Sequence, residues 1–306
     1  MSRGYLPEDH LDARVSAEGR EPNAAGRPKT GEVREQASNH APQPPGRASD
    51  RPRVNTLETR TVYELRGRTY RLRNSEIATM VELGKFRAVA REDLAEIVYD
   101  GNNDRLRPDV ENLLRQGLVE MKSIPHEEMG SRKLLTLTKN GHRFLMQTES
   151  AGKGQAIYHG FTRPREAHHD ADLYRLYQKA AAKIESQGGR NLRVVLDGEL
   201  KKHLYRDLAK LGEDRNSADG KHAIAEKHGL QVVRGKIPVP DVRIEYETCD
   251  GEPARVHLEL ATAHYRGPDL AEKVRAGFSL YARAHDVAKL TRILHQRELP
   301  AEILSL

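Results

Sequence analysis

The stretch PDVRIEYETCDGEPARVHLELA, residues 240–261, alternates apolar and polar side chains on both sides of a short turn. Val242 and Ile244 share one face of the first run, and Asp241 begins that run on the opposite face. The second run repeats the pattern and places Glu259 between two leucines. Side chains of a strand alternate between its two faces, so this pattern predicts two half-buried strands. The turn CDGEPA is short enough to pair them as an antiparallel hairpin.

Glu259 has two interpretations. The simpler one is a carboxylate on a solvated outer face of the sheet, which is ordinary in antiparallel sheets. The other is a metal-binding acid that acts together with Asp241 of the adjoining strand. An Asp at the head of one strand, a Glu inside the next and a preceding helix form the skeleton of the PD-(D/E)xK nuclease core. That chemistry needs two carboxylates converging on Mg²⁺, which activates a water molecule against a phosphodiester.

The nuclease pattern also needs a lysine, normally two residues after the Glu, to orient the water and stabilise the developing charge. Here that position holds Ala261, and the next candidate is Lys273 in the helix predicted over residues 268–285. We therefore expect Asp241, Glu259 and Lys273 to form a vestigial or weakly catalytic site, with Asp241 and Glu259 as its metal ligands. Mg²⁺ would be its cofactor if it is active, and the sequence indicates no other cofactor.

The part of the chain before this region follows the layout of a winged helix: helix, helix, turn, helix, then a β-hairpin. The sequence predicts helices over 75–87, 91–99 and 107–119, strands over 119–124 and 133–138, and a closing helix after Thr138. Ser75 is the expected N-cap of the first helix. Pro108 suits the first turn of the third helix, and Gly117 suits its C-terminal cap. A small hairpin that turns at residues 66–68 comes before them.

Basic and amide side chains gather where a winged helix contacts duplex DNA, because the first residues of its recognition helix reach base edges and phosphates. The predicted DNA-binding residues lie at the start of this helix and on the wing: Asn102, Asn103, Arg105, Arg107, Arg132 and Lys133. Winged helices also bind proteins, and acidic residues near both segments weaken the positive field. Double-stranded DNA is nevertheless the partner that this arrangement favours.

The whole chain is predicted to be an α+β protein. We expect a disordered N-terminal tail over 1–58, a winged helix-turn-helix domain over 59–147, a linker over 148–165, and an α/β restriction-endonuclease-like domain over 166–306. The tail is rich in Pro, Gly and Arg and has no sustained apolar period, so it cannot offset the entropy lost on ordering.

Several motifs together resemble the replication-relaxation proteins of plasmids and other mobile elements. They are NLLRQGLVEMKS followed by LLTLTKNGHRFL, a helix that opens with two histidines, and PD followed by a strand with a central Glu and the helix EKVRAGFSLYA. The resemblance covers roughly residues 76–306. It implies a DNA-binding protein with a nuclease-like second domain, associated with plasmid replication or DNA topology. Ala261 departs from the nuclease pattern, so the resemblance leaves catalytic activity open.

The net charge of +6 favours a polyanionic partner. The single cysteine excludes an intramolecular disulfide, no apolar run is long enough to span a bilayer, and we expect a cytoplasmic protein. A homodimer and replication or conjugation proteins are further partners to consider. Two other functions stay open: a Mg²⁺-dependent DNA endonuclease or nickase, and a winged-helix transcriptional regulator with a dimerising C-terminal domain.

If the N-terminal tail is disordered, a chain that starts near Asn55 should have the same melting temperature as the full chain, within about 2 °C. Calorimetry or circular dichroism measures this. A markedly lower melting temperature would show that the tail contributes to the folded state.

Overall fold

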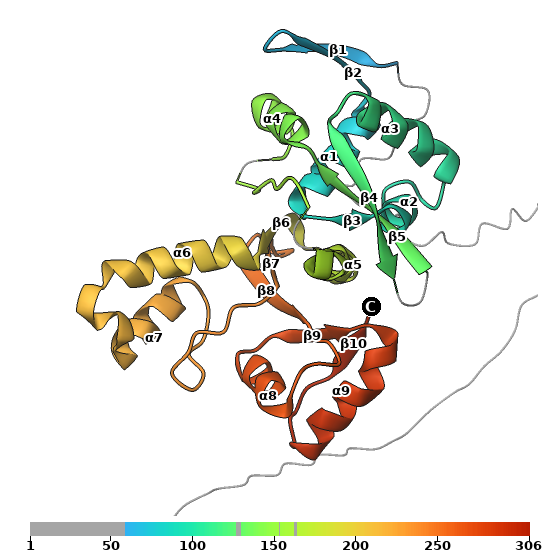
Figure 1. Cartoon of the computed structure of the whole chain (residues 1–306). Helices are drawn as coiled ribbons and strands as arrows, with labels where there is room; N and C mark the ends of the chain where they lie inside the picture. The colour runs from blue at the N-terminus through green and yellow to red at the C-terminus, as the bar shows by residue number, and fades with distance from the viewer. Residues whose placement is uncertain (1–58, 127–129, 153, 162–163) are drawn as a thin grey trace, which may run out of the picture. The chain divides into compact units, whose positions relative to one another are not determined.

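A computed structural model describes residues 59–126, 130–152, 154–161 and 164–306, which form nine α-helices and three β-sheets (Figure 1). The predicted α+β class is therefore confirmed. These residues all belong to one compact unit. The predicted disordered tail, residues 1–58, lies outside the described residues. No helix in the described part of the chain is long and apolar enough to cross a membrane.

The first sheet is a two-stranded hairpin of β1 (Thr61–Leu65) and β2 (Arg68–Leu72). Arg66 and Gly67 connect the strands with φ angles of 50° and 74°. Two successive positive φ values define the type I′ turn, whose twist matches that of a hairpin. The predicted hairpin is confirmed.

The next sheet has three antiparallel strands in the order β3-β5-β4, namely β3 (Val89–Ala90), β5 (Gly130–Leu137) and β4 (Val119–His126). Four helices accompany it: α1 (Asn74–Lys85), α2 (Arg91–Ile97), α3 (Asn103–Arg115) and α4 (Lys139–Thr148). The predicted order of four helices and a β4–β5 hairpin is confirmed, and the short strand β3 between α1 and α2 was not predicted.

The ends of α1 and α3 agree only in part with the sequence predictions. Ser75 lies inside α1 rather than at its N-cap, and its hydroxyl donates a 2.6 Å hydrogen bond to Asp109 of α3. Helix α3 begins earlier than predicted because the Asn102 side chain caps it, accepting from the backbone N–H of Arg105 at 3.1 Å. Pro108 therefore lies inside α3, where it removes one helical hydrogen bond. Gly117 has a φ of 66° just after α3, which confirms its predicted role in the C-terminal cap.

The third sheet has five strands in the order β10-β9-β8-β7-β6. Strands β6, β7 and β8 are antiparallel neighbours, whereas β9 and β10 are added in parallel to β8. The strands are β6 (Arg190–Leu196), β7 (Val242–Glu247), β8 (Pro253–Leu260), β9 (Ser279–Ala282) and β10 (Ile303–Ser305). The helices are α5 (Pro164–Ser186), α6 (Asp197–Lys210), α7 (Ala218–Lys227), α8 (Gly267–Arg275) and α9 (Ala284–Gln296), with a short 3-10 helix, η1 (Gly212–Asn216).

The β7–β8 hairpin is confirmed, but the single helix predicted over 268–285 is wrong. That segment forms α8, then strand β9, then the start of α9. Gly277 has a φ of 78° and ends α8, because an L side chain rarely adopts this conformation. The residues that follow it are buried between β8 and β10.

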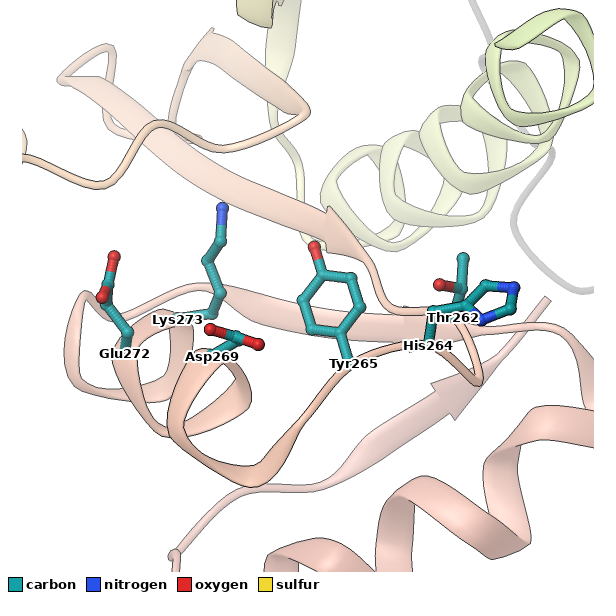
Figure 2. A pocket seen from close by; sticks show the side chains of 6 residues that line it. All are labelled: Thr262, His264, Tyr265, Asp269, Glu272 and Lys273. Carbon is teal, nitrogen blue, oxygen red and sulfur yellow. The ribbon is translucent and has the colours of Figure 1, made fainter. Parts of the chain in front are cut away.

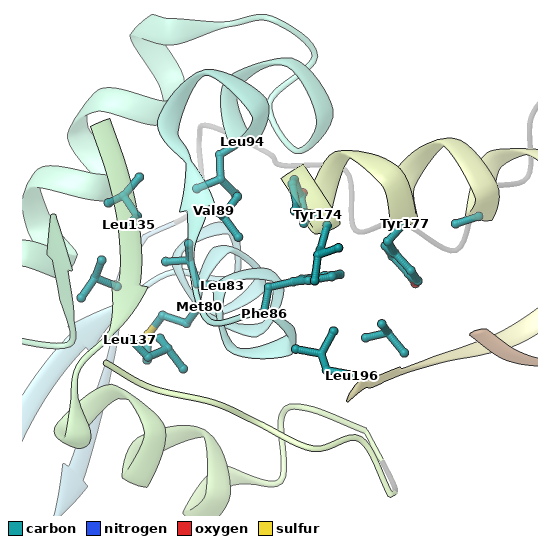
Figure 3. Packing of buried hydrophobic residues seen from close by; sticks show 14 of the residues in the cluster. Met80, Leu83, Phe86, Val89, Leu94, Leu135, Leu137, Tyr174, Tyr177 and Leu196 are labelled. Atoms are coloured by element: carbon teal, nitrogen blue, oxygen red, sulfur yellow. The ribbon is translucent and has the colours of Figure 1, made fainter. Parts of the chain in front are cut away.

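Helix α5 packs against the three-stranded and the five-stranded sheets, with β3 on one side and strands β6, β7 and β8 on the other (Figure 1). The Phe86 ring contacts the Tyr174 ring edge-on at 5.2 Å between centroids and the Tyr177 ring at 5.5 Å (Figure 3). These side chains belong to one apolar cluster that runs from Met80 through α5 to Leu258 of β8. The two predicted domains therefore share a hydrophobic core.

The segment predicted as a linker, residues 148–165, is hydrogen-bonded to the N-terminal part where it is described. The Tyr158 backbone N–H donates to the Gly84 carbonyl at 2.7 Å, and that of Gly160 donates to the Leu137 carbonyl at 2.9 Å. A Cβ atom at Gly84 would lie 2.9 Å from the Ile157 side chain. Glycine at position 84 therefore allows this segment to approach α1 closely.

Because Phe86 is 1% exposed within this shared core, Phe86→Ala should lower the free energy of unfolding by about 3–5 kcal/mol. Hydrogen exchange of amides in α3 and in β7 should accelerate together, since both depend on the same core. The exposed Met146, changed to Ala, is the control and should have little effect. Acceleration confined to α3 would show instead that the two parts unfold separately.

Candidate functional site

The structure brings Asp241 and Glu259 together at the start of β7. Val242 pairs with Leu258, so continuing the same register by one residue sets Asp241 opposite Glu259. The Asp241 backbone N–H lies 3.3 Å from Oε2 of Glu259, and Oδ2 of Asp241 accepts from the Leu260 backbone N–H at 2.9 Å. The prediction that these two acids lie side by side is confirmed.

Glu259 does not face water. It is only 1% exposed, so the interpretation of a solvated outer-face carboxylate is wrong. Its Oε1 lies 2.7 Å from Nζ of Lys273 and accepts a 2.5 Å hydrogen bond from the Tyr265 hydroxyl. The approach of Lys273 from the helix after β8 is therefore confirmed. Nζ of Lys273 also donates to the Val239 carbonyl at 3.1 Å, which holds the ammonium beside the strand.

Burial raises the pKa of Glu259 and the nearby charge of Asp241 adds to this, while Lys273 and Tyr265 lower it, leaving it at about 7. Burial and the neighbouring Glu259 carboxylate raise the pKa of the Tyr265 phenol. The phenol therefore keeps its proton and acts as a donor. Tyr265 was not predicted as a site residue. Its position six residues after Glu259, just beyond the strand end, was the available signal.

His169 of α5 is the second residue that sequence reasoning missed. Its Nε2 lies 3.6 Å from Oδ2 of Asp241, and its Nδ1 lies 3.9 Å from Oδ1 of Asp170. Burial lowers the pKa of His169, but hydrogen bonds and charge from Asp170 and Asp241 outweigh burial and raise the pKa to about 10. At neutral pH an imidazolium therefore faces Asp241. The two adjacent histidines at 168 and 169 stood out in the sequence, but only the fold shows that one of them reaches β7.

The two acids do not fit Mg²⁺ in this arrangement. Mg²⁺ takes oxygen ligands in octahedral geometry. Here the Lys273 ammonium lies against Glu259, and the His169 imidazolium lies against Asp241. No group of three or more His, Cys, Asp or Glu side chains in the described part of the chain is placed to hold a metal ion. Lys273 and His169 supply the positive charge that a metal would otherwise bring.

The surroundings of Ala261 disfavour a lysine at this position, where the nuclease pattern normally has one. Ala261 is fully buried in an apolar cluster with Leu270 of α8 and Leu280 of β9. A lysine there would bury its ammonium among apolar groups at a large free-energy cost. The side chain of Lys273 instead lines an open pocket of about 360 Å³ beside the acids (Figure 2), together with Thr262, His264, Tyr265, Asp269 and Glu272.

The predicted DNA-binding residues at the start of α3 lie on the surface. Arg107 has a 73% exposed side chain and pairs with Glu111 at 2.9 Å. Asn102 and Asn103 are exposed, and Arg105 is half-buried. Asn103 accepts a 3.3 Å hydrogen bond from Arg91 of α2.

Of the two predicted wing residues, Lys133 is exposed, but the prediction for Arg132 is wrong. Arg132 is 4% exposed, and its guanidinium donates to Asp93 at 2.9 Å and to Asp172 at 2.7 Å. Alternation along β5 turns it inward, toward α2 and α5. It has no surface from which to contact DNA.

No protein-family model matches the chain, and no curated protein matches it either.

The electrostatics of Glu259 predict how its titration responds to its neighbours. Because Lys273 and Tyr265 both stabilise the charged carboxylate, Lys273→Met and Tyr265→Phe should each raise the pKa of Glu259 above about 7. Carboxyl ¹³C NMR measures this, and Glu259→Gln assigns the resonance. An unchanged or lowered pKa in Lys273→Met would contradict the ion pair.

Proposed function

We propose that the protein binds double-stranded DNA in the replication or maintenance of a plasmid or other mobile element. In this proposal residues 59–147 form a winged helix that contacts the duplex through α3. Residues 166–306 form a restriction-endonuclease-like domain of the PD-(D/E)xK type that has lost most or all of its catalytic capacity. The motifs that resemble replication-relaxation proteins support the biological setting.

The observation that carries DNA binding is the exposed N-terminal end of α3. Asn102, Asn103 and Arg107 are exposed there, on a helix that follows α2 after a short turn and precedes the β4–β5 hairpin. This is the position from which a recognition helix reaches base edges and phosphates. Lys133 on β5 adds a positive charge on the hairpin for the DNA backbone.

The acids of β7 and β8 support a nuclease-like origin for the second part. Asp241 at the head of one strand, Glu259 inside its neighbour and a preceding helix match the skeleton of that core. Lys273 pairs with Glu259 at 2.7 Å, which supports a lysine that has moved to the following helix. The occupied carboxylates and the buried Ala261 favour a binding or assembly role over cleavage.

Two alternatives have different expected results. A Mg²⁺-dependent endonuclease would cut DNA and lose that activity when Glu259 is changed. A transcriptional regulator with a dimerising C-terminal domain would bind a promoter, and its gene would not lie beside replication or conjugation genes. Glu259 pairs with Lys273, and Asp241 pairs with His169. These ion pairs favour neither the endonuclease nor the regulator over the proposed DNA-binding protein.

DNA binding is tested by replacing Arg105 and Arg107 with Ala together. Each lost phosphate contact should reduce the slope of log affinity against log salt by about one unit, so duplex binding should weaken and its salt dependence flatten. Fluorescence anisotropy over a salt series measures both. The exposed Arg275 and Arg292, changed together to Ala, remove the same charge elsewhere and should leave the slope unchanged. Equal binding by both double variants would remove α3 from the DNA surface.

Cleavage is tested with supercoiled plasmid and Mn²⁺. We expect little or no nicking by the native protein, because loss of one electrostatic partner of the transition state reduces the rate by about a hundredfold or more. Glu259→Gln is the control for any residual activity. Robust nicking that Glu259→Gln abolishes would establish an active nuclease.

A further inference from the structure

We propose that the solvent-facing side of α6 is a second nucleic-acid surface, which binds a single strand by its phosphates and by stacking of one base on Tyr205. We call this surface the α6 strip, and it consists of Lys201, Lys202, Tyr205, Arg206 and Lys210. It is separate from the α3 surface. The inference rests on the proposed function only in that the ligand is again DNA.

The exposed positions of α6 carry no negative charge. The residues of this helix that face solvent are the five of the α6 strip and Ala209. The three acids of α6 are elsewhere: Asp197 and Glu199 lie in its first turn and are half-buried, and Asp207 is buried. A helix face that only needs to be solvated ordinarily mixes acids and bases. Here the exposed charges of the helix are all positive, and its acids are half-buried or buried.

The spacing of three of these cations is unfavourable for the helix. Lys202, Arg206 and Lys210 follow one another at intervals of four residues, and like charges at this spacing destabilise an α-helix. Asp207 beneath them compensates in part, because it lies 3.0 Å from Lys210 and 3.8 Å from Arg206. A row of cations about 6 Å apart along a helix is suited to a polyanionic strand.

Tyr205 distinguishes a nucleic acid from other polyanions. This residue is 59% exposed and lies in the middle of the cations along the helix. Among the described residues, the other exposed large apolar side chains are Val62, Met121 and Met146, none of which is aromatic. An exposed ring between cations is the arrangement with which proteins stack bases of a single strand. In a duplex the faces of the bases are covered by their neighbours, so the ring selects an unpaired base.

The α6 strip also leads toward the acidic site. Lys201 pairs with Asp197 at 2.8 Å, and the Asp197 backbone N–H donates to the Asp241 carbonyl at 3.0 Å. Helix α6 itself is held by α7 through a small cluster that includes Leu204 and Ile224. A strand that lies along the cations would therefore end beside Asp241. In a nuclease-like domain the phosphodiester of the bound nucleic acid lies beside these acids.

The experiment measures binding of a fluorescent single-stranded oligonucleotide and of an abasic strand of equal length. Tyr205→Leu should raise the Kd for the base-bearing strand at least about fivefold and leave the abasic strand unchanged. Tyr205→Phe keeps the ring and should bind as the native protein does. Lys202→Ala with Arg206→Ala should weaken both strands and reduce the salt slope by about 1.4, since each single-strand phosphate contributes about 0.7.

The control for charge is Lys183→Ala with Arg292→Ala, which removes two exposed cations from other helices. Circular dichroism verifies that every variant stays folded. Single-strand binding unaffected by the Lys202 and Arg206 changes would overturn the inference, as would equal effects of Tyr205→Leu on base-bearing and abasic strands. Duplex binding measured in parallel with the Arg105 and Arg107 variant shows separately whether the α3 surface stands.

Discussion

The fold depends on the guanidinium of Arg132, which joins Asp93 of α2 to Asp172 of α5 inside the protein. Arg175 adds a second ion pair to Asp93, and Arg283 adds one to Asp172 at 2.6 Å. Removing one partner from a buried pair leaves an uncompensated charge and typically costs about 3–5 kcal/mol. The apolar contacts around Phe86 join the same elements. Charge and core packing therefore fix α5 between the two larger sheets.

The acidic site follows from this placement. Once α5 is fixed, His169 reaches Asp241, and α8 brings Lys273 to Glu259. Two carboxylates that would repel one another when buried are each held by a cation of the chain itself. The negative charge of this pair of acids is therefore balanced within the chain itself.

Features that depend on neighbouring residues were predictable from the sequence. The turn at Arg66 and Gly67, the cap at Gly117 and the pairing of β7 with β8 all come from local backbone preferences and alternation. Other features depend on distant contacts and were not predictable. The sequence predicted Arg132 as an exposed cation of the wing, whereas in the structure α5 covers it.

Strand β9 was not predicted, for a different reason. Its apolar residues continue the pattern of the preceding helix, and Gly277 was the one local signal of a break. Its pairing partners, β8 and β10, are distant in the sequence, so their edges could not be foreseen. For the acidic site, the spacing identified Asp241, Glu259 and Lys273, whereas His169 and Tyr265 became site residues only through tertiary packing.

The position of α5 limits how such a protein can be recombined. An N-terminal part cut out before Pro164 and fused to another protein would leave Phe86 and Asp93 without the rings and arginine that cover them. The N-terminal part can therefore be altered by substitutions on its exposed surface, or exchanged together with the part that contains α5. Because the two parts share one hydrophobic core, neither can be transferred to another protein without the other.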